Sequence, residues 1–104
     1  MAITNKRLCS GTLGDSNATL YTAPAGAGAI AIIKSVALCN KTTNPVTVTL
    51  ELDGKYVIHE HALAAHDSLI YEHLDQIIEA GELIEGLASA AASVDYCICG
   101  KEIT

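Results

Sequence analysis

Residues 20–54, LYTAPAGAGAIAIIKSVALCNKTTNPVTVTLELDG, decide the fold of this chain. Within them, residues 46–52 alternate strictly between apolar and polar, which is the period of a β-strand with one buried face. Asp53-Gly54 follows, a residue pair typical of a tight β-hairpin turn. The stretch therefore reads as a strand, a Pro/Gly turn, a second strand, a polar loop and an alternating strand. This order predicts a β-sandwich.

The longest apolar run covers residues 29–40, which exceeds the usual strand length of about 5–6 residues. Its alanines make a helix the rival interpretation, but its β-branched residues and the two glycines before it favour a strand. With regular pairing, Lys34 would share the buried face with the apolar residues that follow it. We therefore expect a β-bulge near Lys34-Ser35, because a lysine is costly to bury.

The rest of the chain continues in short apolar segments separated by turns at a spacing of roughly 8–12 residues. These segments predict further strands at residues 18–22, 56–63, 68–73, 83–89 and 94–103. Residues 74–80 are the only helix candidate. We expect seven to eight strands in one antiparallel sandwich domain, residues 18–104. Residues 1–17 are expected to be a polar N-terminal arm, either frayed or ordered on a neighbouring molecule.

The register of the hairpin at Asp53-Gly54 has two alternatives. A two-residue turn places Leu52 opposite Lys55 and brings His59 to the inner face. A three-residue loop with a bulge places Leu52 opposite Tyr56 and turns the histidines outward, with Glu60 on the inner side. Both registers remain open at the level of sequence.

Composition narrows the class of protein. The 104 residues suffice for one core, which is built from Val, Ile, Leu and Ala because Phe and Trp are absent. We expect modest stability for a lone copy, and hence association with copies of itself or a partner. A net charge of −6 disfavours nucleic acid as a partner. No apolar run has the roughly 20 residues of a membrane span, and the first residues do not resemble a signal peptide.

Four histidines lie close together in the sequence: His59, His61, His66 and His73. His59 and His61 would share one face of a strand and could chelate a metal if a third ligand came from a neighbouring strand. A polar sheet face or a contact between subunits is the favoured interpretation. We predict no metal and no cofactor, with these four as the candidates if a metal binds.

The cysteines, Cys9, Cys39, Cys97 and Cys99, lack the C-x-x-C spacing of zinc sites. We expect four free, buried thiols in a protein made in the reducing cytoplasm. No nucleophile motif such as G-x-S-x-G occurs, and the glycines at 26 and 28 precede a strand and not the helix of a phosphate loop. The sequence therefore predicts a protein that is not an enzyme.

The first residues offer a candidate interface. Lys6 and Arg7 are two of only six basic residues in an acidic chain, and they lie between Ile3 and Leu8. A local positive end of this kind can dock on an acidic patch of a neighbour. We predict that Ile3, Lys6, Arg7 and Leu8 contact another subunit or another protein.

Three segments carry a resemblance to a known group of proteins. LYTAPAG at 20–26, IKSVALCN at 33–40 and IEAGELI at 78–84 resemble a pattern in small structural proteins of tailed bacteriophages and prophages. The last segment has Glu82 where aspartate is commoner. The resemblance covers residues 18–103.

This resemblance implies a jelly-roll-like sandwich that serves in the virion and is made in the bacterial cytoplasm. A capsid decoration (cement) protein is the favoured role: a homo-oligomer, most often a trimer, that binds the major capsid protein or other virion proteins. Net charge and the lack of a membrane-spanning run, given above, predict that neither nucleic acid nor a membrane is a partner. Alternatives are a neck or tail connector, a fibre protein, or a receptor- or carbohydrate-binding module of the virion.

Overall fold

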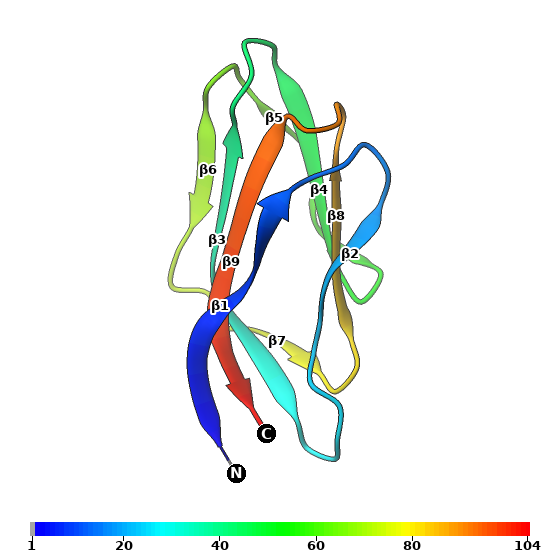
Figure 1. Cartoon of the computed structure of the whole chain (residues 1–104), viewed down its shortest axis with the longest axis vertical. Helices are drawn as coiled ribbons and strands as arrows, with labels where there is room; N and C mark the ends of the chain where they lie inside the picture. Colours follow the sequence, from blue (N-terminus) through cyan, green and yellow to red (C-terminus); the bar gives the residue numbers. More distant parts are fainter. Residues whose placement is uncertain (1) are drawn as a thin grey trace.

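The computed structural model describes residues 2–104, which form nine β-strands in two packed antiparallel sheets (Figure 1). The strands are β1 (Ile3–Thr12), β2 (Ala18–Thr22), β3 (Ile30–Asn40), β4 (Val46–Leu52), β5 (Lys55–Leu63), β6 (Ser68–Tyr71), β7 (Gln76–Glu79), β8 (Leu83–Ala88) and β9 (Val94–Ile103). The first sheet has the order β1-β9-β3, with β6 and β7 both paired to the far side of β3. The second sheet has the order β2-β8-β4-β5. The molecule is elongated, 45 × 23 × 18 Å.

The strand pairs are nested along the chain. β1 pairs with β9, β2 with β8, β3 with β6 and β7, and β4 with β5. Each pair lies inside the preceding one, as in a long hairpin that has been rolled into two layers, and this is the jelly-roll topology. The pairs β3–β9 and β4–β8 then join the hairpins within each sheet. The prediction of an antiparallel, jelly-roll-like sandwich is confirmed, with nine strands among residues 2–104 and not the seven to eight expected.

The N-terminal segment belongs to the sandwich, so the expectation of a separate arm is wrong for residues 3–12. This segment is β1, which pairs with β9 along its whole length. Leu8 and Leu13 anchor it in the core. At the ends of the two strands, the Ala2 N–H donates to the Thr104 carbonyl (2.8 Å) and the Thr104 N–H donates to the Ala2 carbonyl (3.0 Å). Met1 lies outside the described residues.

Residues 74–80, the only helix candidate in the sequence, do not form a helix. Residues 76–79 form β7 instead, and pair with residues 30–33 of β3. Ile78 points into the core and Ile77 points outward, which is strand alternation. Pairing with β3 overrides the weak local preference of this segment for a helix. No helix long and apolar enough to cross a membrane occurs among residues 2–104.

The bulge predicted at Lys34-Ser35 is confirmed. Ile33 pairs with Gly100 and Ser35 pairs with the preceding residue of β9, so the register of β3 shifts at Lys34. The shift lets the Lys34 ammonium leave the core face and form an ion pair with Asp75, while the apolar residues on both sides of it stay buried. A side chain on Gly100 would overlap the carbonyl oxygen of Ile32. The bulge therefore needs glycine on the facing strand.

Irregularities in neighbouring strands lie at the same level of this sheet. The register of β1 slips just after Arg7, and Arg7 and Ser35 both face Cys99 of β9. On the far side of β3, strand pairing is interrupted between β6 and β7. There the Leu74 N–H donates to the Lys34 carbonyl (2.9 Å). At this level β1 and β3 each contain an extra residue, and the chain between β6 and β7 is not a strand. β9 has no such irregularity here, so it is the continuous strand of the first sheet.

Asn40 closes one end of the core. Its side chain is fully buried. Its Nδ2 donates to the carbonyls of Asn44 (2.8 Å), Ala64 (3.1 Å) and Leu63 (3.3 Å). Its Oδ1 accepts from the backbone N–H (3.0 Å) and the hydroxyl (2.8 Å) of Thr42. One amide thus joins the end of β3 to the loop before β4 and to the end of β5.

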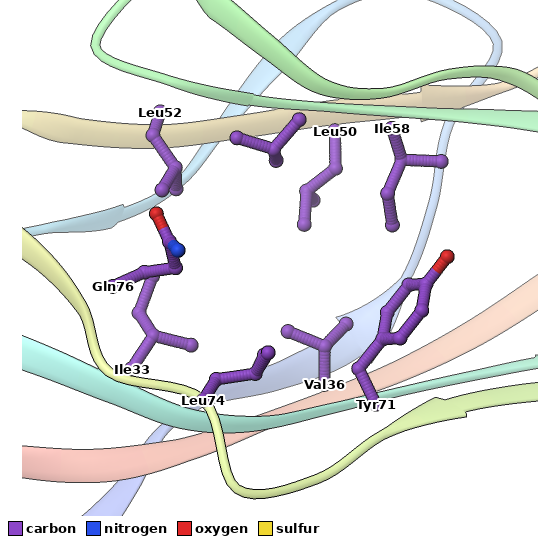
Figure 2. A pocket seen from close by; sticks show the side chains of 9 residues that line it. Ile33, Val36, Leu50, Leu52, Ile58, Tyr71, Leu74 and Gln76 are labelled. Atoms are coloured by element: carbon purple, nitrogen blue, oxygen red, sulfur yellow. The ribbon is translucent and has the colours of Figure 1, made fainter.

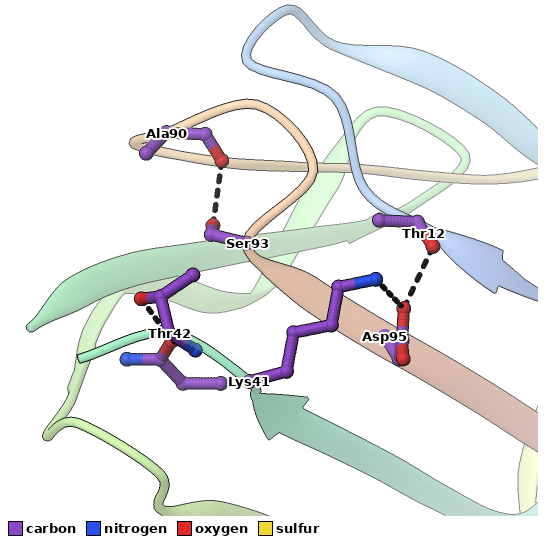
Figure 3. A network of polar contacts seen from close by, with 7 residues as sticks. Thr12, Lys41, Thr42, Ala90, Ser93 and Asp95 are labelled. Carbon is purple, nitrogen blue, oxygen red and sulfur yellow. Dashed lines mark hydrogen bonds and ion pairs between the residues drawn. The ribbon is translucent and has the colours of Figure 1, made fainter. Parts of the chain in front are cut away.

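A second polar network lies beside it, where the end of β1 meets β9 and the loop after β3 (Figure 3). Asp95 accepts from the Thr12 hydroxyl (2.7 Å) and contacts the Lys41 ammonium (3.1 Å). These two partners, Thr12 first, hold the pKa of Asp95 below its usual value. The Ser93 hydroxyl donates to the Ala90 carbonyl (2.6 Å) and tightens the turn before β9.

Candidate binding edges

Exposed apolar side chains collect on one side of the sandwich. The two sheets end there in β5 and in β6 and β7, and we call residues 56–79 the β5–β7 edge. Of the six large apolar side chains that residues 2–104 expose, five lie on this edge: Tyr56 (60%), Val57 (48%), Ile70 (60%), Tyr71 (40%) and Ile77 (57%). The sixth, Ile3 (59%), lies on β1. Such clustering on a small domain marks a contact surface.

The edge strands β6 and β7 of the first sheet have apolar side chains on both faces, as their pairing with β3 shows. Tyr71 lies opposite Val36 on the inner face, whereas Ile70 lies opposite Ala37 on the outer face. In β7, Ile77 likewise faces outward. Strands that are apolar on both faces are typical of sheets covered on both sides. Here the outer face is open to solvent.

A cleft opens between the sheets at the same edge. Its volume is about 320 Å³. It is lined by Ile33, Val36, Leu50, Leu52, Val57, Ile58, Tyr71, Leu74 and Gln76. In Figure 2, Leu50, Leu52 and Ile58 face Val36, Leu74 and Tyr71 across the opening, and the labelled polar groups are the Tyr71 hydroxyl and the Gln76 amide. The cleft is suited to an apolar group and not to acid–base chemistry.

The β5–β7 edge is acidic. Residues 56–100 contain eight Asp or Glu and no Lys or Arg. On the edge itself the carboxylates are Glu60, Asp67, Glu72, Asp75 and Glu79, all exposed. The hydrogen bond and ion pair with Lys34 of β3 hold the pKa of Asp75 below its usual value. The other four carboxylates add a negative field around the apolar residues.

The opposite end of the first sheet is basic. We call residues 2–12 the β1 edge; they contain Lys6 and Arg7 and no acidic residue. Ile3, Lys6 and Arg7 are exposed, as a contact role requires. The Lys6 Nζ lies 3.4 Å from a carboxylate oxygen of Glu102. Leu8 is 8% exposed and belongs to the core, so its prediction as an interface residue is wrong.

The four histidines do not form a metal site in the structure of residues 2–104. His59 and His61 are exposed on β5, His66 lies in the β5–β6 turn and His73 in the link between β6 and β7. No group of three His, Cys, Asp or Glu side chains suited to a metal occurs among residues 2–104. The ring of His59 instead contacts that of Tyr56, with the ring centres 4.1 Å apart and the planes tilted by 42°. All four histidines thus belong to the β5–β7 edge.

The hairpin combines the two predicted registers. Leu52 faces Lys55, as in the two-residue turn. Further along, register shifts place His61, and not His59, opposite Val48. Ile58 is consequently buried, and both histidines are exposed.

All four cysteines are free, but the expectation that they are buried is wrong: Cys39 is exposed, and the other three are only half-buried. Cys9 is half-buried, and burial followed by the nearby Cys97 and Cys99 raises its pKa to about 11. The Cys97 and Cys99 sulfurs lie 3.8 Å apart, at hydrogen-bond distance, and form no disulfide. Burial is the main cause that raises the pKa of Cys97.

Sequence reasoning singled out the β1 residues and gave the His-rich segment at 59–73 as a polar sheet face or a contact between subunits, but it did not identify the exposed apolar residues of the β5–β7 edge. The lack of Lys and Arg from residue 56 to residue 100 was visible in the sequence. The grouping of Tyr56, Val57 and Tyr71 was not, because it depends on how the two sheets stack.

The sequence matches no protein-family model and no curated protein. Among solved structures, the chain is similar to one from "Structure of infectious bursal disease virus Gt strain". The likeness has 13% identity and a TM-score of 0.47, and it covers 97% of this chain and 30% of that one. The chain thus spans less than a third of the viral chain. The nested strand pairs, and not this likeness, define the jelly roll.

Proposed function

We propose that this protein is a non-enzymatic structural protein of a virion, a decoration (cement) protein of a tailed bacteriophage that self-associates and binds the assembled capsid. The observation that carries the proposal is a single jelly roll whose exposed apolar residues lie on open sheet edges. Jelly rolls are recurrent in viral capsid domains. Because fold alone does not assign a function, the resemblance of residues 18–103 to phage structural proteins supplies the second support.

The mechanism is adhesion by repeated contacts. Each copy presents apolar side chains on the β5–β7 edge and charged residues on both edges. One contact through such an edge would be weak, but symmetric copies bound to neighbouring capsid subunits act together. Many weak contacts would then hold the shell against internal pressure.

A carbohydrate- or receptor-binding module is the second candidate. Tyr56 and Tyr71 are exposed on the same edge, and sugars bind to exposed aromatic rings. Tyr21 and Tyr96 instead pack against the core and cannot contribute. Two tyrosines form a small platform, so this candidate ranks below the decoration role.

The decisive experiment is quantification of this protein against the major capsid protein in purified particles by mass spectrometry. A decoration protein is expected at a copy number comparable to that of the capsid protein. A few copies per particle would point to a neck, tail or fibre position instead. Absence from purified particles would overturn the virion role.

A matched binding assay separates the second candidate. Shells stripped of this protein are incubated with the purified wild type or with Tyr56→Ala/Tyr71→Ala, and a glycan array is probed with both. Decoration predicts that the wild type rebinds to the shells. Glycan binding that is lost in the variant, without rebinding to shells, would favour the carbohydrate module.

A further inference from the structure

We propose that copies of this protein join head to tail, with the β1 edge of one copy seated on the β5–β7 edge of the next. The proposal deepens the proposed structural role, since it names the surfaces through which the copies associate. Four properties of the two edges support it: free backbone, opposite charge, matching apolar residues and position on opposite ends of one sheet.

Both edges have free backbone groups. β1 pairs with β9 on one side only, and β6 and β7 pair with β3 on one side only. Each therefore presents unpaired N–H and C=O groups, which are a template for pairing with another strand. Because they are the two ends of the same sheet, joining them continues the sheet from one copy into the next.

The charges of the two edges are opposite. The β1 edge has Lys6 and Arg7 and no acid, whereas the β5–β7 edge has five acids and no Lys or Arg. Contact between unlike edges is attractive, and contact between two β5–β7 edges brings like charges together. Charge thus selects a head-to-tail contact over a two-fold symmetric one.

The apolar residues divide in the same way. Five of the six exposed large apolar side chains lie on the β5–β7 edge, and the remaining one, Ile3, lies on the β1 edge beside the basic pair. The cleft that opens at Val57 and Tyr71 has room for an aliphatic side chain. We place Ile3 of the incoming copy against it, as the apolar anchor that interfaces of this kind need.

The symmetry follows from the use of two different surfaces. Such a contact is heterologous, so it generates a closed ring when the rotation between copies closes, and a filament when it does not. A trimer is the smallest such ring. Association through rim charges is also expected to weaken at high salt.

Charge reversal on the full chain tests the contact, with mass measured by light scattering after size-exclusion chromatography. The wild type is expected to form one oligomer. Lys6→Glu/Arg7→Glu and Glu60→Lys/Glu72→Lys/Glu79→Lys are each expected to weaken association at least about tenfold. The five substitutions combined give the β1 edge two acids and the β5–β7 edge three lysines against Asp67 and Asp75. They therefore restore opposite charges on the two edges and are expected to restore the oligomer. Asp15→Lys, an exposed acid in the loop after β1, is the control and should change nothing.

Circular dichroism checks that each variant is folded, and Ile3→Ser is a second probe that leaves the charges unchanged. It should weaken association and leave the circular dichroism spectrum of the folded protein unchanged, because the side chain is exposed. A monomeric wild type would overturn the proposal. So would a Lys6→Glu/Arg7→Glu variant of wild-type mass, or a folded five-site variant that stays monomeric. A failed search for the protein in particles would leave these masses unchanged, so the two proposals fail separately.

Discussion

The central strand pairs of the two sheets differ in one respect that shapes the molecule. In the second sheet, β4 and β8 pair residue for residue from Val48 to Leu52. In the first sheet, β3 and β9 shift register at Lys34. Each pair has one glycine: Gly86 faces Leu50, and Gly100 faces Ile33. The first makes room for side chains and the second for backbone, so the same residue type has two structural roles.

The largest effect is expected for Gly100→Ala. The new methyl group would overlap the Ile32 carbonyl oxygen at the bulge, and backbone cannot move aside as a side chain can. We expect the free energy of unfolding to fall by at least about 3 kcal/mol, or the protein not to fold. Urea unfolding followed by circular dichroism measures this. A loss below about 1 kcal/mol would mean that the bulge yields and that the contrast between the pairs is superficial.

Asn40→Ala is expected to be next, with a loss of about 3 kcal/mol. The substitution leaves three buried or half-buried carbonyls and the Thr42 N–H without their partner, at the end of β3 beyond the bulge. The control is Asn44→Ala, because the Asn44 side chain is exposed and its loss should cost under about 0.5 kcal/mol. Equal losses for the two variants would show that the amide does not hold the register of β3.

Gly86→Ala is the matched substitution in the second sheet. Its methyl group would lie 3.1 Å from the terminal carbons of Leu20 and Leu50 and from the Thr49 carbonyl oxygen. Leucine side chains can rotate away, so we expect a loss of about 1 kcal/mol. The same urea titration applies. A loss as large as that of Gly100→Ala would remove the distinction between side-chain and backbone crowding.

Lys34→Ala is expected to have the smallest effect. The side chains of Lys34 and Asp75 are 42% and 74% exposed, and exposed ion pairs contribute little. The midpoint of urea unfolding should be unchanged within error, at low and at high salt. A clear drop that high salt abolishes would show that the ion pair, and not Gly100, holds the bulge.

The regular parts of the fold could be predicted and the irregular ones only in part. Alternation over 46–52 predicted β4, and one lysine in an apolar run predicted the bulge, because both follow from burying a single strand face. β1 escaped prediction because it exposes most of its side chains and is held by backbone pairing with β9, nearly a hundred residues away. β7 lies in the segment that was the only helix candidate, because its strand alternation becomes visible only when it is paired with β3.

The candidate surfaces were predictable to a similar degree. Ile3, Lys6 and Arg7 could be singled out because basic residues are scarce and local in the sequence. Leu8 could not be assigned, since the slip of β1 decides that it points inward. The β5–β7 edge required the stacking of the two sheets, which no local pattern contains.

The two hydrogen bonds between Ala2 and Thr104 make this chain a candidate for circular permutation. A short linker between residues 2 and 104 would close the chain without moving either strand. New termini could then be opened at the exposed Asp53-Gly54 turn. A cargo peptide attached there would leave from the hairpin of the second sheet, whereas cargo on the present ends leaves from beside Ile3. The same jelly roll could thus display cargo from either of two places.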